Sequence, residues 1–274
     1  SFLGEGGVTA VGKAIRNNAT LMTYPRLNRI VNNHMHHLGL WVKAVAGYVQ
    51  FLSARNTIAG NVIHDTPRSS ILFNDNMAGG NNVIENVLWA SDLETNDHGP
   101  ISSWSRMPYI NSEVGCRPGV KPAWNHMERN FVVSAWTGWP GFAGTPFNFD
   151  DGTDMMNVSS NVLVFGGVLG GWHSRDQKYS QNLILRPDLL SLNTACFNCP
   201  SGNFFPGWQH NESAVANDCV TGGVTANAAS GCVLDDLIGT TLLTAENRYF
   251  NLVGDVVGVI TCGDTSYSVA DWQQ

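Results

Sequence analysis

The stretch N-T-I-A-G-N-V-I at residues 56–63 is matched 25 positions later by N-N-V-I-E-N-V-L at residues 81–88. In both copies the last Asn, Asn61 or Asn86, stands three positions after one apolar residue and two positions before another. Related spacing surrounds five further residues of the chain: Asn33, Asn130, Asn161, Asn182 and Asn247. A unit that repeats every few tens of residues is typical of solenoid proteins, in which each repeat forms one turn of a stack.

The unit predicts one turn of a parallel β-helix, in an all-β fold. Apolar residues on short strands would face the interior, while an Asn at the corner between two strands tolerates the left-handed backbone conformation. Its amide can bond to the Asn of the next turn, so we expect these Asn residues to stack as a ladder. We also expect five apolar residues to stack inside: Ile30, Ile58, Val83, Met127 and Val158. The alternative is an ordinary β-sandwich with Asn-rich turns, although sandwich strands alternate over longer runs.

Successive ladder residues are separated by 28, 25, 44, 31, 21 and 65 positions. The short gaps suit a single turn, and the long gaps suit a turn that carries a loop. We therefore predict a single β-helix domain over residues 1–274, with a Pro-rich excursion at 105–124 and an insertion without the repeat at 191–240. The chain starts at Ser1 without an initiator Met, so we expect a piece of a longer protein. Further chain segments or another subunit would then cap the solenoid ends.

Composition excludes two classes of partner. Hydrophobic residues make up 43% of the chain and charged residues only 14%, with a net charge of −7. The 15 basic residues are scattered singly, so no basic stripe is present to neutralise the phosphates of a nucleic acid or an anionic membrane. No apolar run approaches the roughly 20 residues needed to span a bilayer, so we expect no membrane insertion.

Four of the six cysteines fall within the predicted insertion: Cys196, Cys199, Cys219 and Cys232. The Cys-x-x-Cys pair is compatible with zinc or with a redox couple, but a zinc ribbon needs a second close pair of ligands. Disulfide bonds that staple a core-poor loop fit this spacing better, and the connectivity stays open. Cys116 and Cys262 stand apart, and their redox state is also left open.

Three N-glycosylation sequons begin at Asn18, Asn157 and Asn211. Acceptor Asn residues of this kind are used on the surface of secreted proteins. Together with the predicted disulfides, which persist in oxidising compartments, they predict a secreted, extracellular glycoprotein.

A second register brings polar residues together. I-L-F-N-D at 71–75 and F-N-F-D-D at 147–151 share the pattern apolar-x-aromatic followed by Asn-Asp or Asp-Asp, and D-H-G-P at 97–100 lies between them. If these segments stack, their polar residues emerge on one edge, and carboxylates two turns apart are separated by roughly 10 Å. That separation suits the carboxyl pair of an inverting glycosidase. The predicted catalytic residues are Asp75, Asp97, His98, Arg106, Asp150 and Asp151, and the predicted substrate-binding residues are Lys43, Arg68, Glu94 and Trp104.

Each of these groups also has a structural interpretation. An Asn-Asp or Asp-Asp-Gly sequence is usually a turn whose carboxylate caps backbone N–H groups. His34, His36 and His37 resemble metal ligands, but on a strand only His34 and His36 share a face while His37 opposes them. We therefore assign these histidines a structural or groove-lining role and predict no metal site there.

Several segments together carry a family resemblance: residues 67–81, 94–106 and 150–152, and the Cys-Gly and Trp-Gln pairs near the C-terminus. They resemble secreted right-handed parallel β-helix proteins of the pectin-lyase-like superfamily, most clearly over about residues 20–190. The resemblance implies polysaccharide lyases, glycoside hydrolases or epimerases, but also non-catalytic surface proteins. The chain departs from the family at Asn96 and Ser105, where the family tends to carry Gly and Asp.

These observations predict a carbohydrate-active protein that binds a glycan along one edge, with hydrolysis preferred over β-elimination. For hydrolysis, Asp97 or Asp75 would be the acid and Asp151 the base. Elimination would need Lys43 or Arg106 as the base, often with Ca²⁺ held by carboxylates such as Asp150, Asp151 and Asp154. The alternative from another class is a non-catalytic structural or adhesion module of a larger extracellular assembly.

Overall fold

The computed structural model describes backbone and side chains for residues 4–12, 24–74, 78–95, 98–105, 108–110, 121–133, 145–150, 152–165 and 176–185. For residues 111, 120 and 168–169, and for the strands between residues 197 and 268, it describes the backbone.

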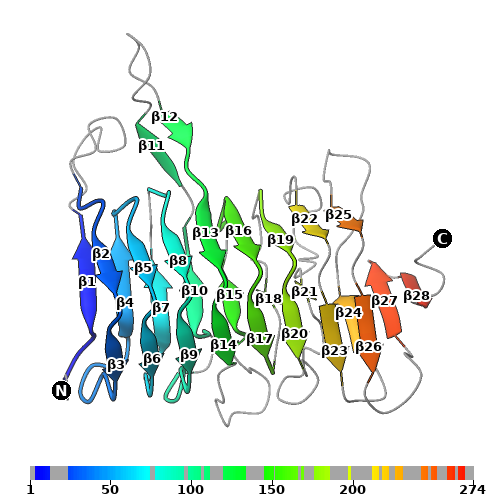
Figure 1. The fold of residues 1–274 in the computed structure, drawn as a ribbon, viewed down its shortest axis with the longest axis horizontal. Helices are drawn as coiled ribbons and strands as arrows, with labels where there is room; N and C mark the ends of the chain where they lie inside the picture. The colour runs from blue at the N-terminus through cyan, green and yellow to red at the C-terminus, as the bar shows by residue number, and fades with distance from the viewer. Residues whose placement is uncertain are drawn as a thin grey trace.

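Three large sheets dominate the described part of the chain (Figure 1). Sheet I has ten strands: β1 (Val8–Val11), β4 (Ala46–Phe51), β7 (Ser69–Phe73), β10 (Ile101–Ser103), β15 (Phe147–Phe149), β18 (Val168–Leu169), β21 (Phe197–Asn198), β24 (Ala226–Ser230), β27 (Gly258–Cys262) and β28 (Thr265–Ser268). Sheet II has eight: β2 (Arg29–Val31), β5 (Thr57–Ala59), β8 (Asn82–Ile84), β13 (Asn125–Glu128), β16 (Met156–Ser159), β19 (Lys178–Ser180), β22 (Glu212–Val215) and β25 (Leu242–Ala245). Sheet III has eight: β3 (His34–His36), β6 (Val62–His64), β9 (Val87–Trp89), β14 (Phe131–Val133), β17 (Val162–Val164), β20 (Leu183–Leu185), β23 (Asp218–Thr221) and β26 (Arg248–Asn251).

The chain passes through sheet I, sheet II and sheet III in turn, and then returns to sheet I one strand further along. All described strand pairs within these sheets are parallel except β27 with β28. Stacked turns of this kind are consistent with a β-helix solenoid, as the repeat predicts, and they exclude an antiparallel sandwich for the described residues. No helix in the described residues is long and apolar enough to cross a membrane.

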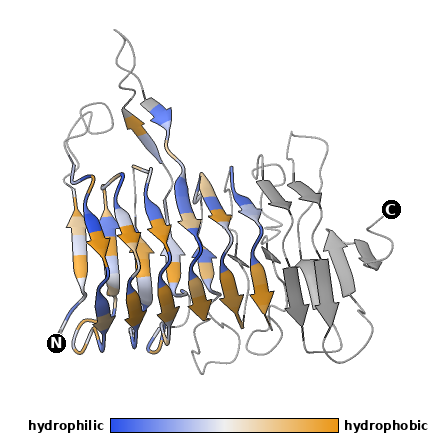
Figure 2. Cartoon of the chain, viewed as in Figure 1, coloured by the Kyte–Doolittle hydropathy of each residue, from blue (hydrophilic) through white to orange (hydrophobic). Residues whose placement is uncertain are grey.

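The predicted stack of five apolar residues inside the solenoid, called the interior column below, is confirmed. Ile30 pairs with Ile58, Ile58 with Val83, Val83 with Met127, and Met127 with Val158, in consecutive strands of sheet II. All five side chains are buried in one continuous core. Figure 2 shows apolar residues recurring at the same level of successive strands. Each fully buried aliphatic side chain contributes about 1.5–3 kcal/mol, and each turn gains that only against its neighbours.

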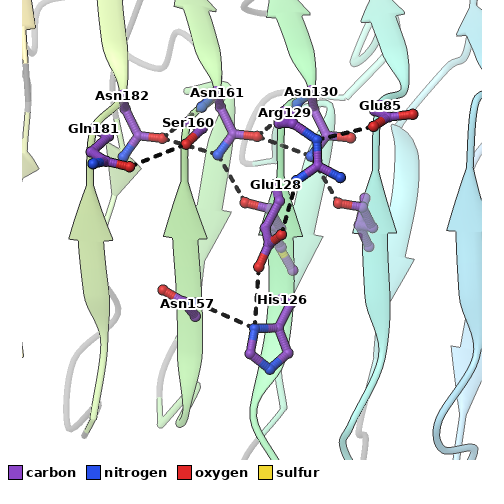
Figure 3. A network of polar contacts seen from close by, with 12 residues as sticks. Glu85, His126, Glu128, Arg129, Asn130, Asn157, Ser160, Asn161, Gln181 and Asn182 are labelled. Carbon is purple, nitrogen blue, oxygen red and sulfur yellow. Dashed lines mark hydrogen bonds and ion pairs between the residues drawn. The ribbon is translucent and has the colours of Figure 1, made fainter.

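The Asn ladder at the corner between sheets II and III is also confirmed (Figure 3). The side-chain amide of Asn61 donates to the Oδ1 atom of Asn86 at 2.9 Å and to the carbonyl oxygen of Ile30, in the preceding turn, at 2.9 Å. The Asn61 backbone N–H donates to the same Oδ1 atom at 3.0 Å. The pattern repeats from one turn to the next through six residues: Asn33, Asn61, Asn86, Asn130, Asn161 and Asn182. Asn247 lies outside the described residues.

The left-handed corner residue is not the ladder Asn, so that prediction was wrong. Positive φ falls on the residue immediately before it, including Glu85 at 57° and Arg129 at 55°. The physical reason is the direction of the side chain: a ladder Asn must point inward to stack, and the left-handed residue before it makes the bend. Glu85 and Arg129 lie beside the ladder (Figure 3). The Nε atom of Arg129 is 3.0 Å from Glu85 Oε1, so the two side chains form an ion pair.

A second Asn ladder lies at the corner that leads into sheet II. Asn28 donates to Asn56 Oδ1 at 2.9 Å, and Asn81 donates to Asn125 Oδ1 at 2.8 Å. The backbone N–H of Asn56 donates to Asn81 Oδ1 at 3.0 Å, which joins the two pairs. In the next turn Met156 takes the place of Asn, so the buried amide nitrogen of Asn125 has no hydrogen-bond partner among the described residues.

The Pro-rich excursion contains a two-stranded antiparallel hairpin, β11 (Tyr109–Asn111) and β12 (Val120–Pro122), which projects from the solenoid in Figure 1. Within residues 191–240, where an insertion without the repeat was expected, strands β21 to β24 instead continue all three sheets. Leu183, Asp218 and Arg248 are in register, and the residue before each is an Asn in the sequence. The repeat therefore continues through these strands, while the loops between them lie outside the described residues.

Candidate functional site

A row of polar and aromatic residues follows three neighbouring strands of sheet I. Phe73, Ser103 and Phe149 are in register at the carboxyl ends of β7, β10 and β15. The next residues are Asn74, Trp104 and Asp150, and the parallel pattern continues through them. The Trp104 N–H donates to the Phe73 carbonyl at 2.7 Å, and the Asp150 N–H donates to the Ser103 carbonyl at 2.8 Å.

This row, Asn74, Trp104 and Asp150, is called the carboxyl edge of sheet I below. The apolar strand residues beneath it fix its position, because Ile71, Phe73, Ile101 and Phe149 are fully buried. Asn74 and Trp104 are half-buried and Asp150 is exposed. The carboxyl edge therefore presents an amide, an indole ring and a carboxylate on successive turns, each about 4.8 Å from the next.

The register also bears on the predicted carboxylate pair. Positions 73 and 149 lie two strands apart in sheet I with β10 between them, as the sequence pattern predicts. Asp75 and Asp151 come two residues after these positions, but both lie outside the described residues. Ser105, which holds the equivalent position between them, is buried and accepts a hydrogen bond from the Asp154 N–H at 3.0 Å.

His98 and Arg68 lie at the opposite end of sheet I, before β10 and β7 respectively. Their side chains contact each other through Arg68 Nη2 and His98 Nε2. A guanidinium can only donate hydrogen bonds, so Arg68 is the donor in this contact and the His98 ring nitrogen the acceptor. The Nε2 lone pair is therefore engaged by Arg68. The three residues of β10 alone place roughly 10 Å of extended backbone between His98 and the carboxyl edge.

Lys43 and Glu94 form an ion pair of 2.8 Å between the loops that precede β4 and β10. Both side chains are substantially exposed, at 41% and 51%. An exposed pair of this kind contributes little to stability. It leaves both residues accessible from solvent on the side of sheet I where its strands begin.

The structure thus divides the predicted site. Lys43, Arg68, Glu94 and His98 precede strands of sheet I, whereas Trp104 and Asp150 follow them. Asp97 and Arg106 lie outside the described residues, like the two other predicted catalytic aspartates. No group of three His, Cys, Asp or Glu side chains suited to a metal ion occurs in the described part of the chain. The proposed Ca²⁺ ligands include Asp154, whose side chain is buried at 2% exposure.

Sequence reasoning missed part of a histidine group on the outer side of sheet III. His36 pairs with His64 of the next turn, and the two rings stack at 5.2 Å. His37, expected to oppose His36, takes a left-handed φ of 54°, and its Nδ1 atom lies 2.7 Å from that of His36. The left-handed bend brings the ring back to the same side. The signal available in the sequence was the equal spacing, because His36 and His64 each follow a ladder Asn by three residues.

The predicted modification sites are mostly outside the described residues, including Asn18, Asn211, Cys196, Cys199 and Cys232. Asn157 lies in β16 with its side chain half-buried, and its amide contacts His126 Nδ1 at 3.2 Å. The backbone of Cys219 in β23 pairs with Ile184, a buried residue of the preceding turn. Glycosylation and disulfide formation therefore stay predictions.

The fold and the carboxyl edge together define the chain as an all-β protein with large parallel sheets, consistent with a β-helix. No protein-family model, curated protein or solved structure matches the chain.

Proposed function

We propose that this chain is a secreted, right-handed parallel β-helix protein of the pectin-lyase-like type that binds a glycan across the carboxyl edge of sheet I. The observation that carries the proposal is the alignment of Asn74, Trp104 and Asp150 on consecutive turns. An indole ring offers an apolar face to the C–H groups of a sugar. The flanking amide and carboxylate can bond to hydroxyl groups on either side.

The carboxyl edge offers one side chain per turn at a regular spacing, and this arrangement suits a polysaccharide better than a single sugar. Neighbouring turns are about 4.8 Å apart, which is comparable with the length of one sugar unit. A glycan lying parallel to the solenoid axis would therefore meet one side chain of the row per unit. Asp75 and Asp151 follow the edge directly in sequence, and they are the residues that would add acid and base groups for hydrolysis.

The second candidate is a non-catalytic structural or adhesion module. The observation that favours it is the separation of the charged residues. Arg68 engages His98 at one end of sheet I, Lys43 pairs with Glu94, and Asp150 lies at the other end. Catalysis that used both His98 and Asp150 would have to bridge the length of β10, so the proposed glycan site does not include His98.

Binding and product formation on a panel of polysaccharides test the proposal. We expect Trp104→Ala and Asp150→Ala each to lower affinity for the bound glycan by about tenfold, or ~1.4 kcal/mol. Trp41→Ala is the matched control, since Trp41 is 83% exposed in a loop that precedes β4. Asp150 is exposed, so its variant separates loss of binding from loss of folding.

The reaction products distinguish a glycoside hydrolase from a polysaccharide lyase and from a non-catalytic glycan-binding protein. Hydrolysis releases reducing ends, whereas β-elimination gives an unsaturated uronate that absorbs in the ultraviolet. Glycan binding without either product supports a binding role for the edge. No binding to any glycan, or binding that Trp41→Ala removes and Trp104→Ala leaves intact, contradicts the proposal and favours the structural module.

A further inference from the structure

Four imidazole rings lie together on the outer side of the first two turns. His34 and His36 come from β3, His37 follows them, and His64 comes from β6 of the next turn. The Nε2 atoms of His34 and His64 face each other at 2.8 Å. Ring centroids in the group are 4.5 Å apart for His34 and His36, and 5.0 Å apart for His34 and His64.

Asp65 determines where the proton of His64 sits. The His64 Nδ1 atom lies 2.9 Å from Asp65 Oδ2. An ionised carboxylate only accepts hydrogen bonds, so the Nδ1 atom of His64 carries the proton. A neutral His64 therefore has a bare Nε2 atom, and its lone pair points at His34. The 2.8 Å contact is then a hydrogen bond in which the Nε2–H group of His34 donates to Nε2 of His64. A metal ion that binds both nitrogens would displace this proton.

That separation is close to what two ligands of one metal ion require. Imidazole nitrogens bind first-row metals at about 2.0–2.1 Å, so two ligands at right angles are roughly 2.9 Å apart and two tetrahedral ligands roughly 3.4 Å apart. The 2.8 Å between the two Nε2 atoms is slightly shorter than the right-angle value, so the two rings would move apart a little and turn their lone pairs from each other toward the shared ion. Tetragonal sites with nitrogen ligands are typical of Cu(II) and Ni(II).

The surroundings hold His64 in a fixed orientation. Its ring stacks on Trp89 at 4.2 Å with an interplanar angle of 12°, and its side chain is only 14% exposed. A carboxylate that holds the far nitrogen of a ligating histidine is the usual arrangement at metal sites, where it fixes the tautomer and raises the basicity of the ligand. Stacking and the Asp65 contact therefore preorganise one ligand, while His34 is exposed and can adjust.

We propose that His34 and His64, with Asp65 positioning His64, bind a divalent transition-metal ion, Cu(II) most tightly. Within the described residues no three side chains converge on such an ion, so the pair supplies two ligands and water fills the remaining positions. Imidazole suits copper, nickel and zinc, and affinity for a given site rises to a maximum at Cu(II). The proposal is independent of glycan binding, because these residues lie on sheet III.

The test is titration of the untagged protein with Cu(II) alone, followed by calorimetry and by electron paramagnetic resonance. We expect one site per chain whose spectrum shows coupling to two equatorial nitrogen nuclei. His34→Ala and His64→Ala should each weaken this site by at least about tenfold, and Asp65→Asn by about 10–100-fold through loss of orientation. His126→Ala is the matched control, because this imidazole lies on sheet II beside Glu128, at 3.5 Å.

His34 is exposed, so His34→Ala remains a valid test even if His64→Ala fails to fold. Wild-type protein that binds Cu(II) no better than the variant lacking both histidines overturns the proposal. A site that survives both single substitutions but is lost in His36→Ala or His37→Ala overturns the assignment equally, because it would place the ion at the other imidazole pair.

Discussion

Replacing Asn86 by Leu removes one rung from the middle of the first ladder. The Nδ2 atom of Asn86 donates to Asn130 Oδ1 and to the Ile58 carbonyl oxygen, both at 2.9 Å. Its Oδ1 atom accepts from the N–H of Asn61 at 3.0 Å and from the Nδ2 atom of Asn61 at 2.9 Å. Leucine has the same branching at Cγ and makes none of these four bonds.

The magnitude follows from the groups left without a partner. Two buried donors of Asn61 lose their acceptor, and an orphaned buried group costs about 1–3 kcal/mol. The Oδ1 atom of Asn130 keeps the backbone N–H of residue 86, which donates at 3.0 Å in the native chain. Burying a leucine side chain returns about 1.5–3 kcal/mol. The net expectation is a loss of about 1–3 kcal/mol in the free energy of unfolding.

Asn33→Leu is the matched control. Asn33 is exposed at the end of the ladder, and no hydrogen bond to its Oδ1 atom is present among the described residues. Its amide donates to Asn61 Oδ1 at 2.9 Å, an atom that also accepts from the Asn33 backbone N–H at 3.0 Å. The substitution therefore orphans no buried donor, and we expect a loss below about 1 kcal/mol.

Urea denaturation followed by far-ultraviolet circular dichroism measures the two losses. Hydrogen exchange of the Asn61 backbone amide adds a local reading, because its acceptor is the Oδ1 atom of Asn86. We expect faster exchange at Asn61 in Asn86→Leu than in Asn33→Leu. Equal stability and equal exchange in the two variants would refute the reasoning, because the ladder hydrogen bonds would then make no contribution to the free energy of unfolding.

Three further outcomes are expected. Desolvation is the largest cause of the lowered pKa of His36, and the neighbouring imidazoles lower it further. As the pH falls, the unfolded chain therefore binds a proton at this residue before the folded chain does, and the folded state loses stability. Nuclear magnetic resonance titration should place the pKa of His36 below its ordinary range in the native chain and show a higher value in His64→Ala. The same pKa in both proteins contradicts this expectation. In Gly99→Ala the new methyl group would overlap the Thr145 carbonyl oxygen, so a loss of about 1–3 kcal/mol in denaturation is expected and a neutral result excludes the close approach. Cys196, Cys199, Cys219 and Cys232 should resist alkylation until reduced, and four free thiols or stoichiometric zinc by mass spectrometry would remove the case for secretion.

The ladder and the interior column were predictable because both are local and periodic. Asn61 and Ile58 keep fixed offsets within one short segment, and parallel stacking converts equal offsets into contacts. The second ladder was visible in the same way, since Asn56 and Asn81 each precede a ladder Asn by five residues. Periodicity around Asn217 was obscured because the apolar positions there hold Ala214 and Cys219, which are small.

The site was harder to predict because convergence depends on which end of a strand a residue occupies. His98 precedes the apolar residue Ile101, whereas Asp150 follows Phe149. In parallel strands these positions fall at opposite ends of the sheet, although both lie near the same motif in the sequence. The position of the left-handed residue was equally hidden, because outward-facing Glu85 and Arg129 have no sequence preference for that conformation.

Selective ¹⁵N labelling of asparagine, followed by measurement of nuclear Overhauser effects between side-chain amide protons, tests the stacked parallel architecture most directly. The account predicts that the amide protons of Asn86 lie close to those of Asn61 and Asn130, which are 25 and 44 residues away in the sequence. Asn130 should in turn be close to Asn161. Effects confined to residues within the same segment, with no connection between turns, would contradict the solenoid and every inference built on its register.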